Sequence, residues 1–201
     1  ALNRVDVFFF IFKGQDKDKL IDLRRELCER HINDPHYRFV EARSPERERG
    51  EVDYKTSVDE LNLAKQRTFE RLINEELADD QCGGFLVWGD PALYDSTIRI
   101  LQAILASGTC TFEFEVIPGI TSVQALAAQH KVPLNQIGRS VEITTGRRLA
   151  AGQVSDADSL VVMLDAQDAY QHVADQQTQI YWGAYLGTPD EILISGKLGE
   201  V

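Results

Sequence analysis

The sequence predicts an α/β fold in which parallel strands alternate with helices. Residues 5–12 form a continuous run of Val, Ile and Phe around one Asp, which is typical of a strand covered on both faces. Through the first half of the chain, similar runs alternate with segments whose apolar residues recur at helical spacing. Beyond Pro118 the predicted strands lie closer together and the helices are shorter. We therefore expect an N-terminal α/β domain with a parallel sheet at residues 1–115 and a C-terminal α/β domain with a mixed sheet at residues 116–201.

The individual elements follow from the same patterns. Leu20, Leu23 and Leu27 predict a first helix at residues 18–30, and a capping box formed by Ser57 and Glu60 marks the expected start of a second helix that ends near residue 78. Further helices are expected at 96–106, 122–129 and 168–176. Strands are expected at 5–12, 37–40, 85–88, 112–117, 141–144, 160–164, 180–186 and 191–195.

Composition and charge restrict the class of protein. Hydrophobic residues make up 43% of the 201 residues, and the net charge of −11 argues against a nucleic-acid partner, which needs clustered Lys and Arg. No apolar run reaches the roughly 18 residues that span a bilayer, and no signal peptide is recognisable. The three cysteines and four histidines are scattered without metal-ligand spacing. We expect a soluble protein of the reducing cytoplasm with no metal and no membrane partner.

A predicted strand runs into a Gly-Asp-Pro turn at residues 89–91, just before the next helix. Gly89 allows the backbone to turn sharply or to approach a ligand closely, and Pro91 fixes φ. In open α/β sheets, ligands bind beyond the carboxyl ends of the strands, where this loop lies. Taken alone, the triplet is more often a structural turn.

A second junction has a similar design. The strand predicted at 112–117 leads into Pro118 and Gly119, and Thr121 or Ser122 can cap the helix that follows. Free N–H groups at this helix start favour an anionic group, such as a cofactor carboxylate. Alone, this junction is equally well explained as a plain helix cap.

Together, the motifs resemble the tetrapyrrole methylase family, the class III S-adenosylmethionine-dependent methyltransferases. The matching order is Gly-Asp-Pro-x-x-Tyr at 89–94, a helix, and Ile-Pro-Gly-Ile-Thr-Ser at 117–122. Residues 143–147 resemble the family's strand that ends in a Thr-x-Gly-Arg-type turn. Residues 160–164 resemble the strand whose Met contacts the cofactor, so the resemblance covers nearly the whole chain.

The resemblance implies that S-adenosylmethionine lies folded in a cleft between the two domains, with no metal. The cofactor supplies the reactive methyl group, while the protein aligns sulfur, methyl and acceptor carbon and excludes water. The residues expected to line the cofactor are Gly89, Asp90, Pro91, Tyr94, Thr121, Ser122, Met163 and Leu186.

Within the family, the segments at 87–97, 115–122 and 181–187 are most similar to members that act on the corrin ring. The resemblance then implies methylation of carbon 1 of precorrin-5 with release of acetate, by a homodimer in cobalamin biosynthesis. Arg147 and Arg148 could bind the substrate's carboxylates, or could be solvated surface charges. Asp90 could be the base for acetate release, but we favour a role in shaping its turn.

The ends of the sequence depart from the family pattern. Family members begin with a strand and a Gly-rich loop that ends in Asp-Pro and binds the cofactor, whereas residues 1–4 resemble the end of the helix after that loop. We therefore expect the first strand and a final helix to be missing from this sequence.

Two other interpretations remain open. Another family member, such as a different corrin-ring methylase, diphthine synthase or an rRNA methylase, would share the Gly-Asp-Pro loop, although the segment from Trp182 to Gly187 and the acidic charge argue against it. A non-catalytic α/β module that binds a nucleotide or a partner protein is the second. A hydrolase is disfavoured, because the sequence contains neither a Gly-x-Ser-x-Gly elbow nor a P-loop.

Overall fold

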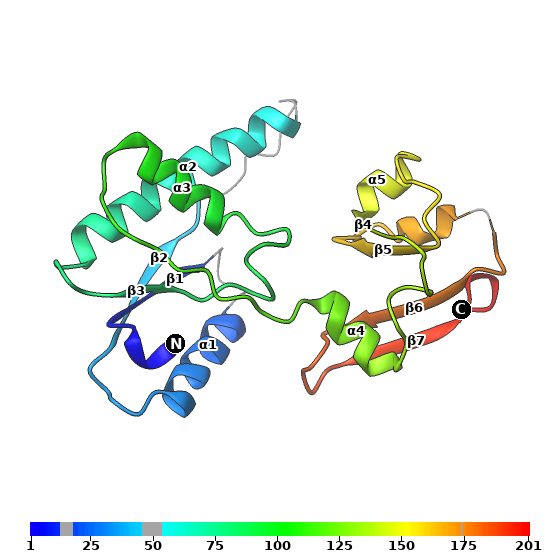
Figure 1. Cartoon of the computed structure of the whole chain (residues 1–201), viewed down its shortest axis with the longest axis horizontal. Coiled ribbons are helices and arrows are strands. Elements are labelled where there is room, and N and C mark those ends of the chain that lie inside the picture. The colour runs from blue at the N-terminus through cyan, green and yellow to red at the C-terminus, as the bar shows by residue number, and fades with distance from the viewer. Residues whose placement is uncertain (13–17, 46–53, 174) are drawn as a thin grey trace. The chain divides into compact units, whose positions relative to one another are not determined.

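The computed structural model describes residues 1–12, 18–45, 54–173 and 175–201 (Figure 1). The chain divides into two compact units, unit 1 (residues 1–119) and unit 2 (residues 120–201). The division falls between Gly119 and Ile120, four residues beyond the boundary expected from the sequence. Each unit is described by itself.

Unit 1 is built on a three-stranded parallel sheet with the order β2-β1-β3. Its strands are β1 (Val7–Phe12), β2 (Arg38–Arg43) and β3 (Gly83–Phe85), and Val7 is in register with both Arg38 and Gly83. The helical elements are η1 (Leu2–Arg4), α1 (Asp18–His31), α2 (Tyr54–Glu76) and α3 (Thr97–Ser107).

The central strand is buried on both faces, as its continuous apolar run predicts. Phe8 and Phe10 point to the face covered by α1, where they pack with Ile21 and Cys28. Val7 and Phe9 point to the opposite face, which α2 covers through Leu72 (Figure 1). Because successive side chains of a strand alternate between faces, one short strand supplies the core on both sides of the sheet.

Strand β3 begins two residues earlier than predicted and ends at Phe85, so the apolar residues 86–88 leave the sheet. Glycines seldom favour strands, but here there is no room for side chains. A Cβ at Gly83 would lie 2.8 Å from Leu77 Cδ1 and from Phe9 Cε2, and a Cβ at Gly84 would lie 2.9 Å from Val5 Cγ1. The close approach of these neighbours therefore sets where the strand forms.

The strand predicted at residues 112–117 is wrong. This segment has no strand partner in the part of the chain that the structure describes, and most of its residues are exposed. Phe112 packs against the core of α2 and α3, while Glu115 pairs with Arg4 at 2.6 Å. An alternating pattern indicates an extended segment with two unlike faces, but a strand also needs a neighbour for its backbone hydrogen bonds.

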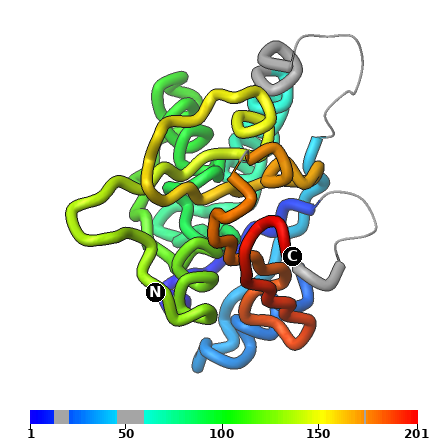
Figure 2. The backbone as a smooth tube through the Cα atoms, turned by 90° about the vertical axis from the view of Figure 1, so that its right-hand side faces the viewer, coloured from blue at the N-terminus to red at the C-terminus, as the bar shows by residue number. Residues whose placement is uncertain are grey.

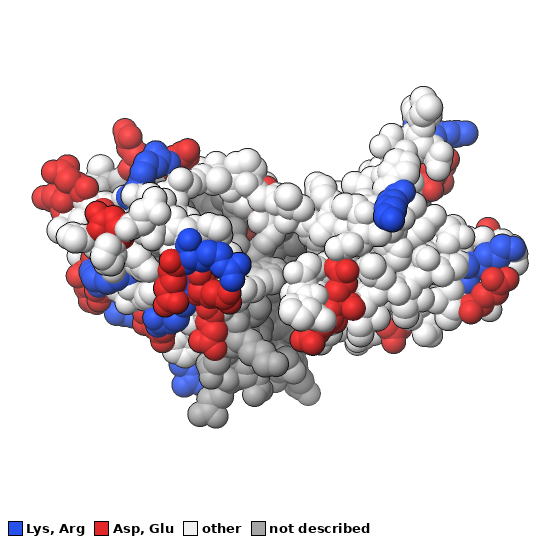
Figure 3. All heavy atoms as spheres, turned by 90° about the horizontal axis from the view of Figure 1, so that it is seen from below, with Lys and Arg blue, Asp and Glu red and all other residues white. Residues whose placement is uncertain are grey.

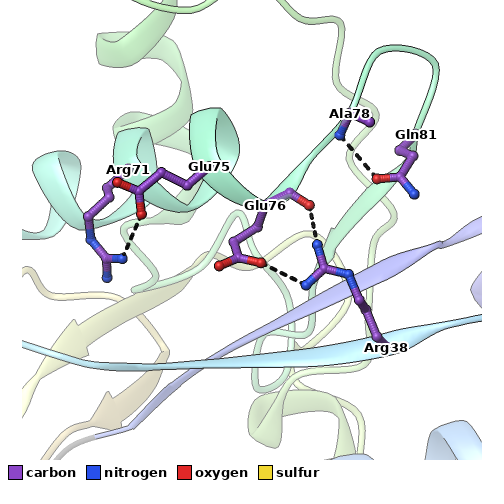
Figure 4. Close-up of polar contacts among 6 residues, drawn as sticks. All are labelled: Arg38, Arg71, Glu75, Glu76, Ala78 and Gln81. Carbon is purple, nitrogen blue, oxygen red and sulfur yellow. Dashed lines mark hydrogen bonds and ion pairs between the residues drawn. The ribbon is translucent and has the colours of Figure 1, made fainter.

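Helix α2 also begins earlier than predicted. It starts at Tyr54, so Ser57 is an interior residue of the helix and the predicted capping box is wrong. At its other end, Arg38 of β2 joins the strand to the helix, donating from Nη1 to Glu76 Oε2 at 2.7 Å and from Nη2 to the Glu76 carbonyl (Figure 4). A cation at the last carbonyls is favourable for a helix C-terminus.

Unit 2 contains two separate two-stranded sheets rather than one mixed sheet, among the residues described. Strands β4 (Val141–Thr145) and β5 (Ser159–Met163) are parallel, and β6 (Gln179–Ala184) and β7 (Ile192–Lys197) form an antiparallel hairpin (orange to red in Figure 2). The connection through α5 allows the parallel pairing of β4 with β5, and the short turn at 185–191 gives the antiparallel pairing of β6 with β7. The helical elements are α4 (Ser122–His130), α5 (Gly146–Ala150), η3 (Ala169–His172) and η4 (Leu198–Glu200).

Helix α4 packs on the hairpin at a glycine. Leu126 Cδ1 lies 2.7 Å from where a Cβ of Gly183 would be, and His130 Nε2 lies 3.0 Å from the carbonyl oxygen of Trp182. Gly183 therefore lets the helix come close to the strand. Across the described residues of both units, no helix combines the length and apolarity needed to cross a membrane.

Two leucines of α2, Leu72 and Leu63, give a matched test of the packing of α2 on β1. Leu72 is 1% exposed between α2 and β1, whereas Leu63 is 55% exposed. We expect Leu72→Ala to lower the free energy of unfolding by about 2–5 kcal/mol, because it leaves a cavity in the core. Leu63→Ala should stay within about 0.5 kcal/mol of the parent. Urea denaturation measures both, and equal losses would contradict the packing of α2 on β1.

Candidate functional site

The Gly-Asp-Pro loop and the Pro-Gly turn lie in contact within unit 1. The backbone N–H of Gly119 donates to Asp90 Oδ2 at 2.9 Å. A Cβ at Gly119 would lie only 2.2 Å from the carbonyl oxygen of Gly89. The two bends therefore pack backbone against backbone, and glycine is the residue that this approach admits.

The carboxylate of Asp90 holds both bends. Its Oδ2 accepts from Gly119, and its Oδ1 accepts from the N–H of Ala92 at 2.7 Å. The carbonyl of Asp90 also accepts from the N–H of Leu93 at 3.1 Å, which closes the turn. Charge-assisted hydrogen bonds to backbone N–H groups are among the stronger ones. With an N–H donor on each oxygen, this geometry supports the interpretation that Asp90 shapes its turn.

Two residues of this loop have left-handed backbone. Gly89 has a φ of 74°, and Tyr94 has a φ of 52° with an exposed side chain. Left-handed backbone costs a residue with a side chain on the order of 1–2 kcal/mol, so it persists where the surroundings impose it. Pro91 between them is buried, so the loop is anchored at its centre and exposes Gly89 and Tyr94.

A cavity of about 330 Å³ adjoins this loop. It lies beyond the carboxyl ends of β1 and β3, and its lining includes Phe12 together with Leu86, Val87 and Trp88, the residues immediately before Gly89. Side chains of α1, α2 and the start of α3 complete the lining. In open α/β sheets this edge is where ligands bind.

In unit 2, α4 begins with a complete capping box. The hydroxyl oxygen of Thr121 accepts from the N–H of Val123 at 3.1 Å, and the N–H of Thr121 donates to Gln124 Oε1 at 3.2 Å. Ser122, the first residue of the helix, is exposed. Sequence reasoning missed Gln124, although the pattern Thr-x-x-Gln is a recognisable capping signal.

The remaining expected cofactor residues belong to different parts of unit 2. Met163 is the last residue of β5 and is half-buried. Leu186 follows β6, and its Cδ2 lies 2.8 Å from the Cβ position of Gly183, on the same glycine that Leu126 of α4 approaches. Leu186 therefore lies near α4, because both Leu186 and Leu126 approach Gly183. Met163 belongs to the other sheet.

Arg147 and Arg148 lie exposed on the short helix α5, where a turn was expected. Arg148 donates from Nε and Nη2 to the carbonyl oxygen of Gln153, at 3.2 and 3.0 Å. Its guanidinium therefore holds the loop that follows α5 through the carbonyl of Gln153. Within the described ranges, no group of three or more His, Cys, Asp and Glu side chains could hold a metal ion.

The family model of the tetrapyrrole (corrin/porphyrin) methylases matches residues 1–201. The chain belongs to this family. A precorrin-6A synthase (deacetylating) from Sinorhizobium sp is 49% identical to this methylase over 201 residues, which are 100% of this chain and 77% of that protein. A cobalt-precorrin-2 C(20)-methyltransferase from Salmonella typhimurium is 35% identical over 83 residues, which are 40% of this chain and 33% of that protein.

Solved structures of methylases share the fold. A cobalamin synthesis related protein (CobF) from Corynebacterium diphtheriae matches with a TM-score of 0.80 and 34% identity, over 99% of this chain and 77% of that chain. A uroporphyrin-III C-methyl transferase from Thermus thermophilus complexed with S-adenyl homocysteine matches with a TM-score of 0.51 and 16% identity, over 97% and 84% of the two chains. The predicted tetrapyrrole methylase fold is thereby confirmed, together with the predicted class of S-adenosylmethionine-dependent methyltransferase.

The contact between the two bends of this methylase can be tested at Gly119. This residue has no left-handed φ, so without the contact an alanine there would stabilise the protein by about 0.4–1 kcal/mol. Because its Cβ would meet the carbonyl oxygen of Gly89, we expect Gly119→Ala to destabilise by about 1–3 kcal/mol instead. Calorimetric unfolding shows whether Gly119→Ala raises or lowers the stability of the protein.

Gly108→Ala provides the comparison, since Gly108 has a φ of 72° and nothing within 4 Å of its Cβ position. Its cost, on the order of 1 kcal/mol, should come from backbone conformation alone. A Gly119→Ala variant more stable than the parent would show that the two bends do not touch.

Proposed function

We propose that this methylase catalyses the precorrin-6A synthase reaction. In that reaction, carbon 1 of precorrin-5 receives a methyl group from S-adenosylmethionine, and acetate is released to give precorrin-6A. The observation that carries the proposal is the 49% identity over all 201 residues to the Sinorhizobium protein of that name. The TM-score of 0.80 to the CobF structure supports it.

The residues proposed to contact the cofactor come from both units. Gly89 and Tyr94 would present exposed backbone and side-chain surface to the cofactor, in a loop stiffened by Pro91 and by the carboxylate of Asp90. When bound, S-adenosylmethionine supplies an electrophilic methyl group.

The start of α4 fits the anionic end of the cofactor. Thr121 fixes the first turn of this helix through its capping box, and exposed Ser122 would offer its N–H and hydroxyl to the cofactor's carboxylate. Met163 and Leu186 would provide apolar surface for the adenosine. These residue types suit the group, since the helix dipole would face an anion and apolar side chains would face an aromatic ring.

The finer properties of the enzyme are part of the proposal. The family resemblance supports a cytoplasmic homodimer with two α/β domains and a tetrapyrrole substrate. The net charge of −11 argues against a nucleic-acid substrate. For a polyanionic tetrapyrrole, an acidic protein needs a local basic lining, to which the exposed Arg147 of α5 is a candidate contributor.

A second candidate is methylation of another corrin carbon. The 35% identity to the cobalt-precorrin-2 C(20)-methyltransferase supports it, but over only 83 residues. The two candidates differ in product, because the C(20) reaction adds a methyl group without removing an acetyl group.

The decisive assay incubates the protein with precorrin-5 and S-adenosylmethionine carrying a ¹³C-methyl group, and analyses the product by mass spectrometry. We expect a product that has gained one labelled methyl and lost one acetyl, with one equivalent of acetate in solution. Omission of S-adenosylmethionine is the control. A labelled product that keeps its acetyl group, or methylation of another precorrin in place of precorrin-5, would assign a different reaction.

A further inference from the structure

Arg24 of α1 lines the cavity of unit 1 in an unusual state for a cation. Its Nε atom is buried and has no hydrogen-bond partner, and among the described residues the guanidinium has no ion-pair partner. Burial lowers the pKa of Arg24, because desolvation disfavours the charged form. Arg24 as a whole is half-buried, and a partly desolvated cation whose buried Nε lacks a partner is costly to keep, so its position in a cavity points to an anionic ligand.

Three other arginines of unit 1 show the contrast. Arg25, next in sequence, pairs with Glu41 and stacks over the ring of Phe39 at 4.6 Å. Arg4 pairs with Glu115, and Arg38 pairs with Glu76. On the face drawn in Figure 3, basic and acidic side chains of this unit lie side by side in the same way. Arg24 differs because it faces the cavity.

A second cation and a helix start share the lining with Arg24. Lys65 of α2 donates from Nζ to the hydroxyl oxygen of Ser96 at 3.4 Å, and Ser96 is the N-cap residue of α3. Asp95 is the acidic side chain of the described lining, and its Oδ1 accepts from the N–H of Thr97 at 2.7 Å. The carboxylate of Asp95 therefore accepts a hydrogen bond from the first turn of α3, and among the described lining residues two cations face one carboxylate.

The shape and surroundings of the cavity favour a carboxylate. A guanidinium presents paired N–H groups that match the two oxygens of a carboxylate, and Arg24 is among the residues that line the cavity. Aromatic walls that include Phe10 and Phe85 lower the local dielectric and strengthen such a pair. At about 330 Å³ the cavity is at the small end for a ligand site, so it suits one carboxylate-bearing arm.

We propose that this cavity is a carboxylate-binding subsite in which Arg24 is the principal contact, assisted by Lys65 and the start of α3. The proposal rests on the proposed function, because both S-adenosylmethionine and a tetrapyrrole with acetate and propionate arms carry carboxylates. If the carboxylate belongs to the substrate, Arg24 takes the role that the sequence left open for Arg147 and Arg148, which could equally be solvated surface charges.

The test compares Arg24→Met with Arg25→Met, which removes the same charge from the neighbouring position outside the cavity lining. Two probes distinguish the sources of the carboxylate: S-adenosylhomocysteine, titrated by calorimetry, and uroporphyrin, an octacarboxylate tetrapyrrole, titrated by fluorescence. We expect Arg24→Met to weaken one of the two probes at least tenfold, as loss of a charge-assisted hydrogen bond would. Arg25→Met should change both by less than threefold.

The pattern of results identifies the ligand. Weaker binding of S-adenosylhomocysteine alone assigns the cofactor's carboxylate to this cavity in place of the start of α4, and weaker binding of uroporphyrin alone assigns an arm of the substrate to the cavity. Arg24→Lys keeps the charge but loses the paired N–H donors of the guanidinium, so it should weaken binding by an intermediate factor. It serves as the second variant if Arg24→Met does not fold. If the parent binds a probe and the Arg24 variants match Arg25→Met, the subsite is refuted and the proposed function stands. If the parent binds neither probe, both proposals fail.

Discussion

The structure of the candidate site depends on a single carboxylate placed between two bends of the backbone. Asp90 accepts from Ala92 in its own loop and from Gly119 in the next, 29 residues further along the chain. The carbonyl of Gly89 comes so near to Gly119 that no side chain fits between the bends. Because each bend is attached to a different element, this contact fixes the end of β3 relative to the segment that leads into α4.

The short strand β3 and the cavity beside it lie next to this contact in unit 1. β3 can be short, because Gly83 and Gly84 seat it against β1 and its neighbours, after which the chain leaves the sheet towards the loop. The residues between β3 and Gly89 then line a cavity instead of extending the sheet. Arg24 lines that cavity half-buried, and its buried Nε has no hydrogen-bond partner among the residues described. Partial desolvation of a cation gives up some stability, and such departures from the local rules are expected at functional sites.

Local patterns in the sequence predicted much of the fold. The buried run of β1 and the helices α1, α3 and α4 lie within a residue or two of their expected positions, because apolar spacing reports which face is buried. Prediction failed where residues distant in the sequence determine whether and where a strand forms. Residues 112–117 are extended but lack a strand partner in the described structure, and β3 is set by side chains from Val5, Phe9 and Leu77. For the site, the two motifs indicated the bends. The partners of Asp90 and the burial of Arg24 Nε depend on tertiary contacts, which residue spacing in the sequence does not reveal.

A double-mutant cycle tests most directly whether the two bends act as one ligand-binding structure. Calorimetric titration with S-adenosylhomocysteine would be carried out on the parent, Asp90→Ala, Gly119→Ala and the double variant. We predict that each single change weakens binding about tenfold or more, and that the double variant is little worse than the poorer single variant, because either change already separates the bends. Additive losses, or single variants that bind as tightly as the parent, would contradict the account.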